Sequence, residues 1–130
     1  MSLVSRTAEI KPWEFVDAFA SRNGKRCIYL MNRMVVSPFA LLAMCTTRIR
    51  ELITVKALSE RGQKALCSKV LKMPDWRLKN HYSCARGFTM DELICALSSA
   101  RDVEQEMKSG SDQMQSFISW FLGVCKKGSL

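Results

Sequence analysis

The chain has 130 residues, of which 48% are hydrophobic and 25% charged, which is ordinary for a globular protein and sufficient for one domain with a buried core. No apolar run approaches the roughly 20 residues of a membrane-spanning helix, and the N-terminus lacks the continuous apolar segment of a signal peptide. The six cysteines form no CxxC pair, so they indicate packed, reduced thiols of a cytoplasmic protein and argue against a disulfide framework.

The formal net charge is +8, and it is unevenly distributed along the chain. Residues 1–86 hold 16 Lys/Arg and 6 Asp/Glu, a net of +10, whereas residues 87–130 hold 4 and 6, a net of −2. A basic half of this kind favours a polyanion or an acidic protein as the partner. A solvated surface with a modest excess of positive charge explains the same numbers equally well.

Nearly the whole chain shows the hydrophobic period of helices, and the two-residue alternation of strands is absent. Breakers are few and well spaced, so the connecting loops are short and neighbouring helices should pack antiparallel. The sequence therefore predicts an all-α, compact helical bundle of about six or seven helices. The predicted helices cover residues 12–22, 25–36, 38–61, 63–72, 75–87, 90–108 and 112–126.

Start and stop signals support these boundaries. Ser37 is suited to cap the long third helix, with Pro38 at its first position. Thr89 and Glu92 have the spacing of a capping box, the clearest helix start in the chain. Gly62 is a natural C-terminal stop for the third helix.

The apolar stripes of these helices predict the core. Four residues fall outside the stripe of the third helix and are therefore not expected in the core: Arg48, Arg50, Glu51 and Thr54. Trp13 is expected to pack in the core. The other predicted core positions are Phe15, Val16, Phe19, Ala20, Cys27, Ile28, Met31, Met34, Val35, Phe39, Leu42, Cys45, Ile49, Leu52, Ile53, Ala57, Leu78, Tyr82, Ala85, Leu93, Leu97, Ala100, Val103, Met107, Met114, Phe117, Ile118, Phe121, Leu122 and Cys125.

Signals of catalysis are poor. His81 is the only histidine, and it could form a dyad with Cys84, three residues further along the same helix. A boundary histidine beside a packed cysteine explains the pair better. A metal site would need more histidines or paired cysteines, and no Gly-rich phosphate loop is present. We therefore predict no catalytic, cofactor-binding or metal-ligating residues.

Residues 65–86 have the outline of a helix-turn-helix, whose second helix would lie in the major groove of DNA. Two features argue against base reading. The basic residues of the second helix lie on both flanks of its apolar stripe and form no single reading face. Its N-terminal positions, which should meet bases, hold Asp75 and Trp76, and Lys72 occupies the turn position where glycine is expected. A stand-alone helix-turn-helix DNA-binding regulator remains an alternative.

Four passages, in this order and at this spacing, resemble a known family. They are "EIKPWEFVDAFASRNGKRCIYLMNRM", "SPFALLAMCTTRIRELITVKAL", "LCSKVLKMPDWRLKNHYSCARGFTMDEL" and "ALSSARDVEQEMKSG". Together they make residues 9–125 similar to the C-terminal (collar) domain of the delta subunit of the bacterial DNA polymerase III clamp loader. The collar domain of another clamp-loader subunit is a close variant of this interpretation.

The resemblance implies a helical collar domain at 9–127, with residues 1–8 as a leader or a linker from a preceding domain. In the family, such domains from five subunits form the ring of the loader that places the sliding clamp on primed DNA. Its partners would be the gamma/tau and delta-prime subunits. The sliding clamp would be contacted only through an N-terminal ATPase-like domain, which is absent here together with the middle domain. The fragment would be a non-catalytic, cytoplasmic part of the DNA polymerase III holoenzyme that needs no cofactor.

The resemblance and the residue types together give two sets of candidate site residues. Large aromatic and arginine side chains often dominate protein interfaces. The candidates for contacts with other subunits are Trp76, Arg77, Arg86, Arg50 and Trp120. The loop between the last two helices, which the resemblance brings near primed DNA without sequence specificity, contributes Lys108, Ser109, Ser111 and Gln113.

Overall fold

The structure is a computed structural model that describes residues 10–110 and 112–126, so residues 1–8, Ser111 and Lys127 lie outside the described part. Within it the chain forms only helices, which confirms the predicted all-α class. The elements are α1 (Pro12–Ala20), α2 (Gly24–Met31), α3 (Pro38–Glu60), the 3₁₀ turn η2 (Lys64–Leu66), α4 (Cys67–Leu71), α5 (Asp75–Arg86), α6 (Met90–Lys108) and α7 (Gln113–Cys125).

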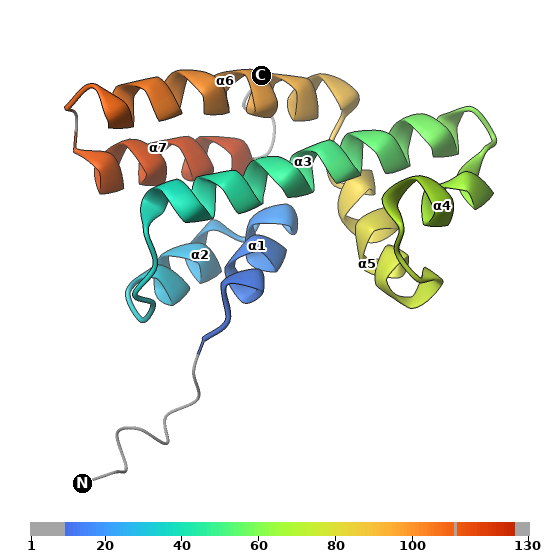
Figure 1. Cartoon of the computed structure of the whole chain (residues 1–130), viewed down its shortest axis with the longest axis horizontal. Coiled ribbons are helices and arrows are strands. Elements are labelled where there is room, and N and C mark those ends of the chain that lie inside the picture. Colours follow the sequence, from blue (N-terminus) through green and yellow to red (C-terminus); the bar gives the residue numbers. More distant parts are fainter. Residues whose placement is uncertain (1–9, 111, 127–130) are drawn as a thin grey trace, which may run out of the picture.

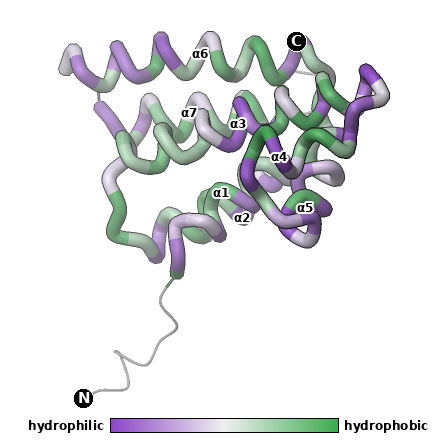
Figure 2. Tube along the Cα trace, turned by 45° about the vertical axis from the view of Figure 1, so that its right-hand side comes forward, coloured by the Kyte–Doolittle hydropathy of each residue, from purple (hydrophilic) through white to green (hydrophobic). Residues whose placement is uncertain are grey.

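The long helix α3 is the centre of the bundle and contacts α1, α4, α5, α6 and α7. Figure 1 shows α6 and α7 as an antiparallel pair on one side of α3. On the other side, α1 and α2 lie under the first half of α3, and α4 and α5 lie under the second half. Hydrophilic and hydrophobic residues alternate along α6 in Figure 2, as expected for a helix with one side on a core.

The predicted caps form as expected. The Ser37 hydroxyl accepts a hydrogen bond from the Phe39 N–H at the start of α3. Thr89 accepts one from the Glu92 N–H, and the Glu92 carboxylate accepts one from the Thr89 N–H, which completes the capping box of α6. Gly62, directly after α3, has φ +73°, a conformation that favours glycine.

The second helix is shorter than predicted. It ends at Met31, and the next turn is closed by i→i+3 hydrogen bonds from the Arg33 and Met34 N–H groups to Leu30 and Met31. The predicted inward position of Val35 is therefore wrong, since this side chain is fully exposed. Helical periodicity cannot place a residue once the helix has ended, and the connection to α3 begins here.

Two further core predictions on α7 are wrong, because Met114 and Leu122 are exposed. Of the other predicted core positions on α7, Phe117, Phe121 and Cys125 are buried and Ile118 is half-buried. Phe117, Trp120 and Phe121 form an aromatic cluster with Phe15 and Phe19 of α1. Phe15 of α1 meets Phe121 edge to face, with ring centroids 5.3 Å apart. The predicted apolar stripe of α7 is wider than the part of the helix that α1 and α6 cover, so Met114 and Leu122 at its edges stay in solvent.

A buried arginine that the sequence did not single out joins four segments of the chain. Arg22, in the turn between α1 and α2, has a side chain only 4% exposed. Its guanidinium donates to both carboxylate oxygens of Glu92, at 2.9 and 3.1 Å. It also donates to the carbonyls of Gly87, Cys125 and Lys126. Arg22 thereby connects the α1–α2 turn, the end of α5, the start of α6 and the end of α7.

Substitution of Arg22 by Met should lower the free energy of unfolding by about 3–5 kcal/mol, because Glu92 would stay buried without its bidentate partner. Urea unfolding followed by circular dichroism measures the change. The matched control is Lys108→Met, which removes the exposed i,i+4 pair with Glu104 and should cost less than about 0.5 kcal/mol. Equal losses of unfolding free energy in the two variants would contradict the conclusion that Arg22 stabilises the bundle.

Candidate functional site

Two tryptophans 63 positions apart in the sequence line one groove. Trp13 of α1 is 59% exposed, so its predicted core position is wrong, and Trp76 of α5 is 74% exposed. Both helices pack on α3, and the groove lies between them, with a volume of about 740 Å³. Its lining, the tryptophan groove from here on, consists of Trp13, Asp17, Arg48, Pro74, Trp76, Arg77, Asn80 and His81.

The floor of the tryptophan groove is a chain of polar and charged side chains. Arg48 of α3, which was not expected in the core, is buried and donates to Asp17 of α1 at 2.9 Å. Its Nε lies 3.6 Å from a carboxylate oxygen of Glu51, and the same oxygen is 2.8 Å from Nε2 of His81 on α5. The network connects α1, α3 and α5 beneath the two indoles, so it fixes the width of the groove.

Two sequence features could have indicated this network. Asp17 lies within the apolar run from Phe15 to Ala20, where it is the only charged side chain. Arg48 and Glu51 are three apart on the longest helix, a spacing that places them side by side. Neither feature identifies His81 as the third partner, because that contact depends on how α5 crosses α3.

The structure does not form the His81–Cys84 dyad. Nε2 of His81 meets Glu51, and its Nδ1 lies 3.4 Å from the carbonyl oxygen of Arg77, so both ring nitrogens have other partners. The Cys84 sulfur lies 3.9 Å from the Ser21 hydroxyl instead. Burial raises the pKa of Cys84 above its ordinary value, which disfavours the thiolate that a nucleophile needs.

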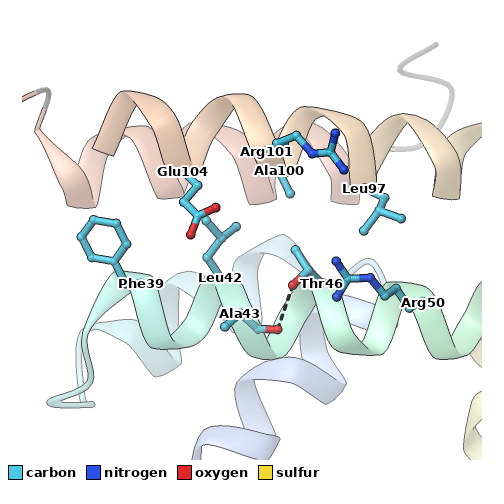
Figure 3. A pocket seen from close by; sticks show the side chains of 9 residues that line it. All are labelled: Phe39, Leu42, Ala43, Thr46, Arg50, Leu97, Ala100, Arg101 and Glu104. Carbon is cyan, nitrogen blue, oxygen red and sulfur yellow. Dashed lines mark hydrogen bonds between the residues drawn. The ribbon is translucent and has the colours of Figure 1, made fainter. Parts of the chain in front are cut away.

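A second hollow lies between α3 and α6, with a volume of about 360 Å³. Figure 3 shows that Arg50 of α3 and Arg101 of α6 line it from facing helices, with Thr46 and Leu97 between them and Glu104 further along α6. Arg50, a predicted interface residue, is exposed and lines this second hollow, not the tryptophan groove.

The other predicted interface residues are scattered. Arg77 lines the tryptophan groove beside Trp76. Arg86 is exposed at the other end of α5, next to the last turn of α3. Trp120 is only 6% exposed, and its indole N–H donates to the Ser99 hydroxyl at 3.0 Å. A tryptophan held this way is part of the core, so Trp120 cannot anchor an interface.

The predicted DNA-proximal residues surround the turn between α6 and α7. Lys108, Ser109 and Gln113 are exposed, and Ser111 lies outside the described residues. Lys108 is 3.6 Å from Glu104, so its charge is partly compensated.

The described residues contain no group of three or more metal-ligating side chains suited to hold an ion. In the same part of the chain, no helix is both long enough and apolar enough to cross a membrane.

The segment from α4 to α5 keeps only the outline of a helix-turn-helix. Lys72 adopts the left-handed conformation, with φ +55°, in the position where glycine was expected. The first helix, α4, has five residues, and the second opens with Asp75 and the exposed Trp76. On the two flanks of α5, Arg77, Lys79 and Arg86 are exposed, whereas His81 is buried.

The fold defines the chain as an all-helical bundle domain. Its tryptophan groove gives it an exposed aromatic surface beside an arginine, the composition that is enriched at the energetic centres of protein interfaces.

The chain belongs to the family formed by the C-terminal domain of the DNA polymerase III delta subunit, and the model of this family matches residues 9–124. It is 26% identical over 125 residues to the DNA polymerase III subunit delta of Bacillus subtilis (strain 168), covering 92% of this chain and 36% of that protein. Its fold is similar to that of a Bacillus subtilis DNA clamp loader delta protein, with a TM-score of 0.72, 21% identity, and coverage of 89% of this chain and 36% of that one.

The family match confirms the resemblance seen in the sequence and does not favour a stand-alone helix-turn-helix regulator. The chain spans about a third of the length of the relatives that it matches.

Because the three tryptophans differ in burial, replacing each by alanine should lower the free energy of unfolding by a different amount. Trp120→Ala should lower the free energy of unfolding by about 3–5 kcal/mol, because it empties a core site. Trp13→Ala and Trp76→Ala should each change it by less than about 1 kcal/mol, since both side chains are largely in solvent. Chemical denaturation of the three variants measures this, and a large loss for Trp13→Ala would contradict its exposed position.

The cysteines should react with a thiol reagent at very different rates at pH 8. Cys95 is exposed and should react first, whereas burial raises the pKa of Cys45 and Cys84 and also shields their sulfurs. The folded chain should therefore show one fast thiol that Cys95→Ser removes. Fast labelling that persists in the Cys95→Ser variant would show that a second thiol is accessible.

Proposed function

We propose that this chain is the collar domain through which a DNA polymerase III delta subunit joins its clamp loader, the assembly that places the sliding clamp on primed DNA. The observation that carries the proposal is the family match over residues 9–124, nearly all of the folded part. The collar domain corresponds to residues 9–127. The partners are the gamma/tau and delta-prime subunits, and the location is the cytoplasm.

The tryptophan groove is the proposed contact surface for a neighbouring subunit. Burying two exposed indoles removes a large apolar area from water, and Arg77 beside them can form charge-assisted hydrogen bonds with a partner. The polar network below keeps the groove open in the free domain, so little ordering is needed on binding. Arg50 and Arg86, on other faces, are proposed contacts for a second neighbour in the ring.

The proposed domain is non-catalytic by itself. Its part in loading is to hold the subunits together, while nucleotide chemistry and the clamp contact belong to other parts of the loader. The turn carrying Lys108, Ser109 and Gln113 is the proposed approach to primed DNA. Contacts there would be to phosphates and independent of sequence.

The double variant Trp13→Ala/Trp76→Ala should lose co-elution with the other loader subunits in size-exclusion chromatography. Truncating hot-spot tryptophans typically costs 2 kcal/mol or more, about a thirtyfold loss of affinity. The measurement uses the 130-residue chain with purified gamma/tau and delta-prime subunits.

The matched control is Val70→Ala/Ile94→Ala, which truncates two exposed apolar side chains of α4 and α6 outside the groove. This variant should co-elute like the parent chain. Retained co-elution of the tryptophan variant would exclude the groove as the contact surface. Failure of the parent chain to co-elute would contradict the proposed function itself.

A further inference from the structure

The outward side of α2 combines uncompensated positive charge with an exposed aromatic ring. Between Asp17 and Glu51 the sequence contains no acidic residue. The exposed residues of α2 and its C-terminal turn fall at positions spaced three and four apart, which places them on one side of the helix. This side, the α2 basic face, consists of Lys25, Arg26, Tyr29, Asn32 and Arg33.

The opposite side of α2 is held in the bundle, which fixes the direction of the α2 basic face. Cys27 and Leu30 are buried, and the helix contacts α1 and α7. At Gly24 a Cβ atom would lie 3.1 Å from Leu122, so the start of α2 is pressed against α7. The basic face therefore points away from the core on a rigid support.

Tyr29 organises the two arginines on this face. The ring is 47% exposed, and the guanidinium carbons of Arg33 and Arg26 lie 3.8 and 5.3 Å from its centroid. Arg33 also donates to the Tyr29 carbonyl at 3.1 Å. A guanidinium held against an aromatic ring keeps N–H groups at its edge for a further acceptor, and its geometry matches phosphate.

Acidic groups on the adjacent elements have other partners. Asp17 of α1 pairs with Arg48, Glu14 accepts a hydrogen bond from the Lys11 N–H, and Asp112 caps the start of α7. Among the described residues, no ion pair involves the basic residues of α2. Their charge is available to an external anion.

We propose that the α2 basic face binds the phosphodiester backbone of DNA independently of sequence, with Arg26 and Arg33 as phosphate ligands held in place by Tyr29. Uncompensated arginines are drawn to a polyanion because their binding releases counterions. This site goes beyond the proposed function, since it gives the domain a DNA contact of its own, separate from the tryptophan groove and from the α6–α7 turn.

The test is fluorescence anisotropy of the 130-residue chain with a labelled oligothymidylate and with a duplex of the same length. Arg26→Gln/Arg33→Gln should weaken binding about tenfold or more. It should also reduce the salt slope by about 1.4 on the single strand or about 1.8 on the duplex, the values for two lost phosphate contacts. The probe that loses more affinity identifies the strand form that the face prefers.

The matched control is Arg61→Gln/Lys69→Gln, which removes the same charge from exposed positions. Arg61 directly follows α3 and Lys69 lies in α4, at the end of the molecule away from α2 (Figure 1). The control variant should keep the parent affinity and salt slope. An equal loss in both double variants would show that only net charge matters, and it would overturn the proposal.

Tyr29 has its own pair of variants. Tyr29→Ala should weaken DNA binding about fivefold, because both guanidiniums lose their support, whereas Tyr29→Phe keeps the ring and should bind like the parent chain. Parent-like DNA binding by Arg26→Gln/Arg33→Gln together with lost co-elution with loader subunits would assign the face to a protein contact and overturn the proposal. Since DNA binding is measured without other subunits, its failure leaves the co-elution test of the proposed function unaffected.

Discussion

The buried pair of Arg22 and Glu92 is the interaction on which the arrangement of the helices depends. A charge taken out of water is tolerated only when every donor finds an acceptor, and Arg22 meets this condition by binding Glu92 and three carbonyl groups. One of these carbonyls, that of Gly87, ends α5, while Arg22 itself follows α1. Through this hydrogen bond Arg22 connects the end of α1 to the end of α5, the two helices that carry the exposed tryptophans.

The tryptophan groove follows from that constraint. Asp17, Arg48, Glu51 and His81 form a second polar network below the indoles, and it again joins α1 to α5 across α3. The polar network at the floor of the groove and the hydrogen bonds of Arg22 both connect α1 to α5, so the two helices that carry the indoles are held by polar contacts as well as by apolar packing. The proposed role of the domain in holding subunits together would benefit from such rigidity, because less conformational freedom is lost on binding.

Some basic residues stabilise the fold, and others form an exposed surface. Arg22 and Arg48 are used inside the fold, whereas the arginines of α2 face solvent beside Tyr29. The basic excess of the first 86 residues is thus partly structural and partly a surface for an external anion. The tryptophan groove and the α2 basic face share no residue.

The sequence by itself determined the all-α class, most helix boundaries and the caps at Ser37 and Thr89, because periodicity and capping are local properties. The ordered motifs also determined the family. Only the tertiary structure decided that Trp13 is exposed, that Trp120 is buried and that Arg22 connects several helices through its hydrogen bonds. Each of these depends on contacts between helices distant in sequence, and a helical stripe shows which side is apolar without showing how much of it a neighbour covers.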